Sequence, residues 1–333
     1  MKSRNIPMTR QSEIYDRFGI KAEKIEIPTL TSNREDWYKQ RFYLSASDDL
    51  VLVTGSYSFQ DKQVISVAGA GDFPINFYYA GARNVLCFDI SPQSCFFSEL
   101  KVATLKLLSY ESFVEFFYPR KYWSKYPQEE KHYSNEIYPF NVDTYKDIKD
   151  AISKQSRIFF DLAFDSRKAG DYLRITPESG IILRRGFSRV KRFNPYLASE
   201  ESYFFAQKMA KTKRFEFYPI SVQDYFEKFD GECDYVYISN IFSDQFDKLI
   251  QFSEKLLKTG KIRTIGITLF YPYADSDLEE ELNNKEVRMR IGLGDPNWKK
   301  MSIVRGKRVI FIEDLNIEYF KSLKRIYLEI TLK

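Results

Sequence analysis

The stretch that decides the fold runs from residue 63 to residue 91 and reads QVISVAGAGDFPINFYYAGARNVLCFDIS. Its first part, Val64–Ala68, is a short apolar run rich in β-branched residues, which is typical of a buried parallel strand. A glycine turn follows at Gly69 and Gly71, then a short helical stretch, and then a second apolar run, Asn84–Ile90, with an acid near its end. This order of elements predicts a ligand-binding unit within a doubly wound α/β sheet.

The alternation of strands and helices continues along the chain. A helix begins after Ser91, with Pro92 in its first position, and apolar residues recur on one face of it: Phe96, Leu100, Ala103 and Leu107. Further strands are predicted at 215–220, 234–241 and 261–271, with helices at 222–229 and 243–259 between them. The runs 308–314 and 325–332 predict two final strands, which we expect as an antiparallel pair at an edge of the sheet.

Length and composition indicate a globular chain of one large or two modest domains. The protein has 333 residues, of which 44% are hydrophobic and 29% charged, enough for a sizeable core. We expect four parts, in chain order: an N-terminal helical segment (1–62), the first half of the sheet domain (63–118), an inserted helical cap that holds the substrate (119–195), and the second half of the sheet domain (196–333).

Scarce residue types exclude several kinds of site. His132 is the only histidine and lies in a charged stretch, so multi-histidine metal sites are excluded, and so is a Ser-His-Asp mechanism unless His132 is its base. The three cysteines, Cys87, Cys95 and Cys233, show no CxxC spacing. We therefore expect no metal, no disulfide framework and a reduced, cytoplasmic setting.

Charge and hydropathy bear on the partners. Lys and Arg number 51 against 46 Asp and Glu, a net charge of +5. We take this excess as too small to indicate nucleic-acid binding and expect no nucleic-acid partner. The N-terminus lacks an apolar signal region, and no stretch approaches the ~18 apolar residues of a membrane span. Peripheral contact with the inner membrane face is expected only if the acceptor is a lipid.

The glycine turn and the acid after the second strand predict an adenosine ligand. Gly69 and Gly71 allow close backbone approach, and Asp89, 20 residues after Gly69, can accept both ribose hydroxyls. Pro74 stands where a dinucleotide fingerprint has its third glycine, which disfavours a nicotinamide cofactor. Asp72 would repel a pyrophosphate but suits an ammonium or sulfonium group, and S-adenosylmethionine (SAM) carries both. The alternative is a tight turn with a helix-capping acid and no ligand.

Three stretches carry a family resemblance: AGAGDFPINF (Ala68–Phe77), VLCFDISPQSCFFSELKVATLKLLSYESFVEFF (Val85–Phe117) and DYVYISNIFSD (Asp234–Asp244). They resemble the SAM-dependent 3-amino-3-carboxypropyltransferases related to the diacylglycerol enzyme of betaine-lipid synthesis. FYLSASDD (Phe42–Asp49) is similar to an upstream segment of that family, whereas Ser91 stands where most members have asparagine. The resemblance implies a Rossmann-like, class I SAM-methyltransferase-like fold.

The resemblance also implies roles for particular residues. Asp72 would approach the cofactor's amino group, and Asp89 would bind the ribose with Ile90 against the adenine. Asp224 would contact the adenine, with helix capping as an equal alternative. The full cofactor-binding set implied is Gly69, Ala70, Gly71, Asp72, Asp89, Ile90, Gln93, Val222, Gln223, Asp224, Ser239 and Asn240.

Three functions remain open from the sequence. Attack on the methionine Cγ of SAM would transfer the 3-amino-3-carboxypropyl group to a lipid or small-molecule acceptor and release methylthioadenosine. Attack on the methyl carbon would make the protein a methyltransferase, and a non-catalytic SAM-binding protein is the third reading. An acceptor that loses a proton needs a base, and the catalytic candidates lie beyond strand ends: Asn240, Asp244 and Tyr271. The basic run 184–192 suits an anionic acceptor, a phospholipid surface or the cofactor carboxylate, and equally a solvated surface.

Overall fold

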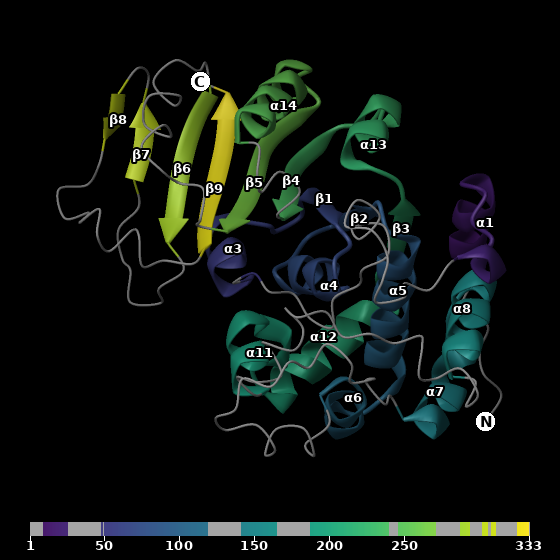
Figure 1. The fold of residues 1–333 in the computed structure, drawn as a ribbon. Helices are drawn as coiled ribbons and strands as arrows, with labels where there is room; N and C mark the ends of the chain where they lie inside the picture. Colours follow the sequence, from purple (N-terminus) through teal and green to yellow (C-terminus); the bar gives the residue numbers. More distant parts are fainter. Residues whose placement is uncertain are drawn as a thin grey trace, which may run out of the picture.

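The computed structural model describes ten segments of the chain: residues 9–25, 48, 50–118, 141–164, 187–239, 246–270, 287–293, 302–305, 308–310 and 325–332. Their strands form a single sheet in the order β3-β2-β1-β4-β5-β9-β6-β7-β8 (Figure 1). The five strands from β3 to β5 run parallel, and they are β1 (Gln63–Val67), β2 (Asn84–Asp89), β3 (Phe215–Pro219), β4 (Cys233–Ser239) and β5 (Ile262–Phe270).

The rest of the sheet is antiparallel. β9 (Arg325–Leu332) lies between β5 and β6 (Val287–Leu293) and runs opposite to both. β7 (Ser302–Arg305) and β8 (Arg308–Ile310) extend the sheet to its edge. A parallel core whose strand order reverses at β1, with an antiparallel strand beside β5, is the class I methyltransferase-like arrangement. The predicted fold class is confirmed.

One part of the predicted sheet is wrong. The runs around 308 and 325 do not pair with each other at an edge, because β9 is an interior strand and β8 alone reaches the edge. β6 was not predicted, since Arg288 and Arg290 interrupt the apolar run that marks the other strands. Strand order depends on long-range pairing, and a local hydrophobic pattern carries no information about the partner.

Helices cover both faces of the parallel strands. Phe73 and Phe77 of α4 (Asp72–Tyr79) pack on Tyr237 of β4. Tyr225 of α13 (Val222–Lys228) packs on Phe88 of β2. Tyr237 is level with Cys87 across the sheet, and Phe88 is the next residue, so its side chain points to the opposite face. Figure 1 shows α13 and α14 (Phe246–Lys258) on one side of the sheet, and α4, α5 (Pro92–Leu107) and α12 (Glu200–Thr212) on the other. This doubly wound arrangement gives the sheet its two-sided core.

The apolar face predicted for α5 is only partly observed. Phe96, Leu100 and Ala103 are buried, but Leu107 is 47% exposed. Every residue of α5 from Gln93 to Leu105 is buried, polar ones included, because the helix packs on β2 and β3 as well as on α8 and α12. A helix enclosed on several sides has no single apolar stripe, and its last turn extends beyond the packed region.

The remaining helices flank this core: α1 (Thr9–Arg17), η1 (Ala22–Lys24), α3 (Leu50–Ser56), α6 (Tyr110–Phe117), α7 (Val142–Ile148), η3 (Lys149–Ala151), α8 (Lys154–Phe164), α11 (Phe187–Phe193) and η4 (Pro195–Leu197). Gln11 of α1 donates to the Phe217 carbonyl at 2.7 Å and accepts from the Phe217 amide at 3.0 Å. This amide side chain therefore satisfies the backbone groups of Phe217 in the edge strand β3. The predicted domain boundaries at 62/63, 118/119 and 195/196 stay predictions.

Cys87, Cys95 and Cys233 are buried free thiols. Among the described residues, no helix combines the length and the apolar character that a bilayer crossing demands.

Candidate functional site

The turn between β1 and α4 accepts only glycine at two positions. Gly69 and Gly71 adopt φ angles of +51° and +80°, where L side chains are strained. A Cβ on Gly71 would lie 3.0 Å from the Ser98 Cα, and one on Gly69 would lie 2.7 Å from the Phe73 ring. The Ser98 hydroxyl donates to the Gly69 carbonyl at 3.1 Å. The turn is therefore held directly against α5, whereas the close approach of its backbone to a ligand stays a prediction.

Asp89 lies at the carboxyl end of β2, beside this turn. Its two carboxylate oxygens accept from the Gly69 amide at 3.3 Å and from the Ser91 amide at 2.9 Å. Burial raises the pKa of Asp89 to about 7, although the hydrogen bonds from Ser91, Gly69 and Ser94 act in the opposite direction. The side chain is half-buried, and the next residue, Ile90, is 47% exposed. A polar acceptor and an accessible apolar surface thus lie side by side at this strand end.

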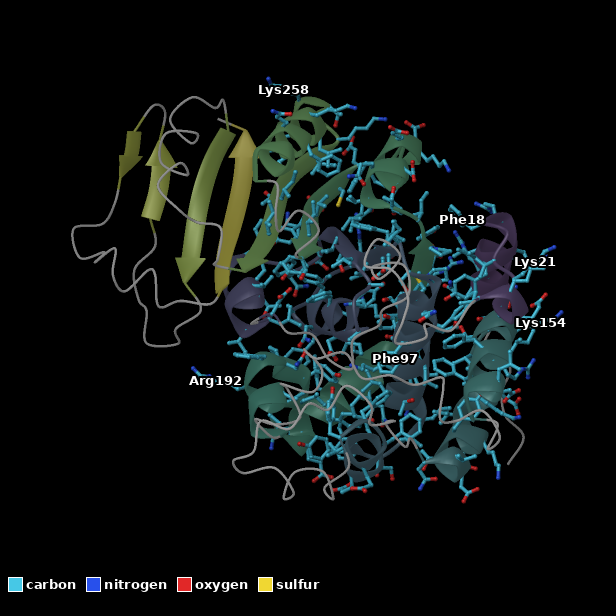
Figure 2. All side chains as sticks on the ribbon, in the orientation of Figure 1. Phe18, Lys21, Phe97, Lys154, Arg192 and Lys258 are labelled. Atoms are coloured by element: carbon cyan, nitrogen blue, oxygen red, sulfur yellow. The ribbon has the colours of Figure 1, made fainter. Side chains whose placement is uncertain are left out.

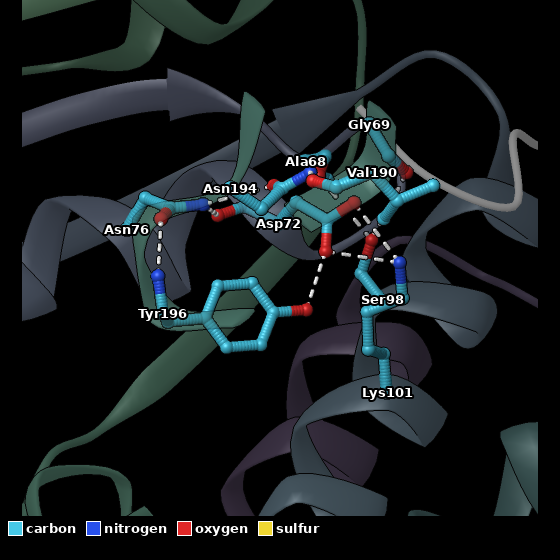
Figure 3. Close-up of polar contacts among 9 residues, drawn as sticks. All are labelled: Ala68, Gly69, Asp72, Asn76, Ser98, Lys101, Val190, Asn194 and Tyr196. Atoms are coloured by element: carbon cyan, nitrogen blue, oxygen red, sulfur yellow. Dashed lines mark hydrogen bonds and ion pairs between the residues drawn. The ribbon is translucent and has the colours of Figure 1, made fainter. Parts of the chain in front are cut away.

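Asp72 is in a different environment from the one that its sequence position suggests. Its side chain is fully buried, and both oxygens lie 3.0 Å from the Lys101 Nζ. The Tyr196 hydroxyl donates to one of these oxygens at 2.7 Å (Figure 3). Burial lowers the pKa of Lys101, with the carboxylate of Asp72 opposing the shift. The negative charge proposed to face a cationic ligand is therefore paired with a buried lysine.

The same cluster continues along α4 to the stretch at the end of the predicted insert. The Asn76 side-chain amide donates to the Asn194 side-chain oxygen at 3.1 Å and to the Asp72 carbonyl at 2.8 Å. The Tyr196 amide donates to the Asn76 side-chain oxygen at 3.4 Å, and the Asn194 amide group donates to the Val190 carbonyl at 3.0 Å (Figure 3). These bonds connect two parts of the chain that are more than 110 residues apart.

The other predicted cofactor-binding residues have varied settings. Ala70 and Gln93 are buried, as is Val222, whereas Gln223 is exposed. The Ile220 amide donates to the Asp89 carbonyl at 2.9 Å, so the residues that follow β3 lie next to the end of β2. The structure therefore brings the glycine turn, Asp89 with Ile90, and the start of α13 to neighbouring strand ends.

Asp224 is occupied by helix capping. Its amide donates to the Ser221 hydroxyl oxygen at 3.1 Å, and the Ser221 hydroxyl donates to the Asp224 carboxylate at 2.7 Å. This reciprocal pair resembles a capping box, so the capping role is observed and the contact of Asp224 with adenine stays a prediction. Ser239, the last residue of β4, is half-buried.

Several candidates lie outside the described residues. These are the three catalytic candidates, the histidine and the first part of the basic run: Asn240, Asp244, Tyr271, His132, Arg184 and Arg185. Arg192, in the last part of the basic run, is exposed at the rim of the molecule (Figure 2).

One buried polar group at the carboxyl ends of β4 and β5 was not predicted. The Tyr237 hydroxyl donates to the Asp48 carboxylate at 2.7 Å and lies 2.7 Å from the Thr268 hydroxyl. Thr268 is in register with Ser239, so this group is level with the end of β4. Asp48 belongs to the upstream segment FYLSASDD, and nothing in the local pattern of that segment indicates that it reaches the sheet.

No protein-family model and no curated protein sequence matches the chain. Solved structures do match. An rRNA methylase from Streptococcus thermophilus is 8% identical, with 85% of this chain and 93% of that chain covered and a TM-score of 0.32. A "putative SAM-dependent methyltransferase" from Streptococcus mutans is 10% identical, with 85% and 47% covered and a TM-score of 0.34. A "putative RNA methyltransferase" from Pyrococcus horikoshii is 12% identical, with 97% of each chain covered and a TM-score of 0.30.

These matches contradict one expectation. Two of the matched structures are described as RNA or rRNA methyltransferases, a description that runs against the expectation of no nucleic-acid partner, and we withdraw that expectation. The physical fault lies in the use of net charge, which averages over the whole surface. Nucleic-acid binding depends instead on where lysines and arginines gather.

Proposed function

We propose that this chain is a SAM-dependent group transferase whose cofactor lies across the carboxyl ends of β1, β2 and β3. The observation that carries the proposal is the Asp89 carboxylate, held between the Gly69 and Ser91 amides with the exposed Ile90 beside it. In open α/β sheets, ligands bind at the carboxyl ends of the strands where the strand order reverses. Here the order reverses at β1.

Each part of the cofactor has a proposed partner. The backbone of Gly69, Ala70 and Gly71 borders the methionine and ribose, Asp89 accepts the ribose hydroxyls, and Ile90 packs on the adenine. Further contacts are proposed from Gln93 and from the start of α13 at Val222, Gln223 and Asp224. Asp72 supports the glycine turn from beneath in this proposal, because its carboxylate is buried against Lys101.

The chemistry belongs to the cofactor, which supplies an electrophilic carbon attached to a positively charged sulfur. The chain has to orient that carbon toward the acceptor and exclude water. We place the acceptor beyond the ends of β4 and β5, with Ser239 and Asn240 facing the reacting carbon. Asp244 and Tyr271 are the proposed proton acceptors.

Product analysis separates the three functional readings. Methyl transfer is the reaction named for the solved structures reported above, and 3-amino-3-carboxypropyl transfer is supported by the motif resemblance. Incubation with labelled SAM and a cell extract yields S-adenosylhomocysteine in the first case and methylthioadenosine in the second. Separation of labelled products into lipid, RNA and small-molecule pools identifies the acceptor. Cofactor binding with neither product would support the non-catalytic reading.

Calorimetry with SAM tests the site itself. Asp89→Ala removes hydrogen bonds to a charged acceptor, so the dissociation constant for SAM should rise about tenfold or more. The matched control is Asp230→Ala, because Asp230 is an exposed acid paired with Lys261 on the surface. An unchanged affinity in the Asp89 variant, or tighter binding of a nicotinamide dinucleotide than of SAM by the wild type, would remove the assignment.

A further inference from the structure

The buried cluster beneath the glycine turn joins two segments that have different places in the proposed function. Asp72 is the first residue of α4 and directly follows Gly71. Tyr196 and Asn194 belong to the stretch Phe187–Leu197, formed by α11 and η4 at the end of the predicted insert. The side chains of Asp72, Tyr196 and Asn194 are all fully buried.

The cluster is a buried ionic network whose members depend on one another. Lys101 and Tyr196 both bond the Asp72 carboxylate, and separating either one would leave a charged group in an apolar interior with fewer partners. The Lys101 Nζ also lies 5.6 Å from the Phe97 ring centroid and 5.4 Å from that of Phe117. A half-satisfied buried ionic network is unfavourable, which favours concerted movement over partial opening.

Both ends of the connection are fixed to backbone as well as to side chains. On the turn side, Ser98 bonds the Gly69 carbonyl and Asn76 bonds the Asp72 carbonyl. On the other side, the Tyr196 amide bonds Asn76 and the Asn194 side chain bonds the Val190 carbonyl. The side chains that link the turn to the Phe187–Leu197 stretch, Asp72, Asn76 and Tyr196, are all buried, so a displacement of the turn is transmitted to the backbone of that stretch.

We propose that Tyr196 and Asn194 are positioning residues that couple the Phe187–Leu197 stretch to the glycine turn, so that cofactor binding and the placement of this stretch stabilise each other. The proposal rests on the proposed function, since it takes the turn as the cofactor-binding element. It assigns Asp72 the role of transmitting this coupling from beneath the turn. Because coupling between two sites is reciprocal, a change in the stretch must also alter cofactor affinity.

A solely structural role predicts something different. If the cluster merely fills the core, loss of the Tyr196 hydroxyl lowers stability without changing how the stretch responds to cofactor. Tyr203→Phe reproduces that case. Tyr203 is also fully buried, and its hydroxyl donates to the Leu108 carbonyl at 3.1 Å, away from the turn.

The test is hydrogen–deuterium exchange of the full chain with and without saturating SAM, together with calorimetry. In the wild type, SAM should slow amide exchange both at residues 69–72 and at residues 187–197. In Tyr196→Phe the protection at 187–197 should be largely lost while that at 69–72 persists, and the dissociation constant for SAM should rise about fivefold or more. Tyr203→Phe should keep both protections and the wild-type affinity.

The outcomes distinguish the two proposals. If the wild type does not bind SAM in calorimetry, the proposed function fails before the coupling is examined. If SAM binds and protects residues 69–72 but leaves residues 187–197 unchanged, the coupling is overturned and the cofactor site stands. Equal losses in Tyr196→Phe and Tyr203→Phe would also overturn it, because the effect would then be one of general stability.

Discussion

Gly71 is constrained by its backbone angle and by its neighbour at the same time. Its φ of +80° lies in the left-handed region, and the position of a Cβ would be 3.0 Å from the Ser98 Cα and 3.1 Å from the Ser98 carbonyl oxygen. The obstructing atoms are backbone atoms of α5, which cannot rotate away as a flexible side chain would. The sequence shows that a glycine turn follows the strand, but only the packing of α5 explains why no small side chain fits at Gly71.

Gly71→Ala should therefore lower the free energy of unfolding by at least about 2 kcal/mol, from left-handed strain and overpacking together. Urea denaturation measures this. Gly55→Ala is the control, since Gly55 lies in α3 with nothing within 4 Å of its Cβ position. That substitution should raise stability by about 0.5–1 kcal/mol. Equal stability of the two variants would contradict the account.

The predicted site residues differ in how far the sequence determines them. Asp89 follows from its place at a strand end, because position along a parallel strand fixes which edge of the sheet a residue reaches. Asp72 shows the limit of such reasoning. Its partners Lys101 and Tyr196 come from other elements, and a local pattern contains no information about which side chains will neutralise a charge.

At the scale of an element, the start of α8 depends on a carboxylate from a different helix. Glu99 of α5 accepts from the Ser153 amide at 2.5 Å and from the Ser153 hydroxyl at 2.8 Å, and the Ser156 hydroxyl also donates to it. Burial raises the pKa of Glu99 to about 7, although these hydrogen bonds act in the opposite direction. The carboxylate satisfies donors at the N-terminus of α8 and fixes this helix against the core.

This raised pKa predicts how stability depends on pH. Below about pH 4.5 Glu99 is protonated in both the folded and the unfolded states. Between there and about pH 7 the unfolded chain ionises first, so stability falls as pH rises, by up to about 3 kcal/mol. Glu99→Gln should abolish that part of the slope in denaturation curves measured from pH 4.5 to pH 8. Glu111→Gln, an exposed glutamate on α6, should retain it, and identical slopes for all three proteins would refute the assignment.

At the scale of the whole molecule, β9 holds the two parts of the sheet together. It pairs with β5 on one side and with β6 on the other, and it is the only described strand that joins the parallel core to β6, β7 and β8. Ile265 of β5, for example, is in register with Val236 of β4 and with Ile330 of β9. Without β9, the central β5 would become an unprotected edge.

A chain that ends at residue 324 should therefore lose cooperative thermal unfolding in circular dichroism and elute as aggregates in size-exclusion chromatography, because an exposed interior edge pairs with other chains. A chain that ends at Leu332 keeps all of β9 and should behave as the wild type. A monomeric, cooperatively unfolding shorter chain would show that the parallel strands are stable without this connection.

The sequence by itself determined the strand, turn and helix order of residues 63–91, the cap at Ser91, and the position of Asp89 at a strand end. These features follow from hydrophobic periodicity and from the stereochemistry of single residues, which act over a few positions. Only the tertiary structure decided that β9 lies inside the sheet, that Lys101 and Tyr196 bury the charge of Asp72, and that Asp48 reaches Tyr237. Those contacts join residues far apart along the chain, and the packing that brings them together has no local signature.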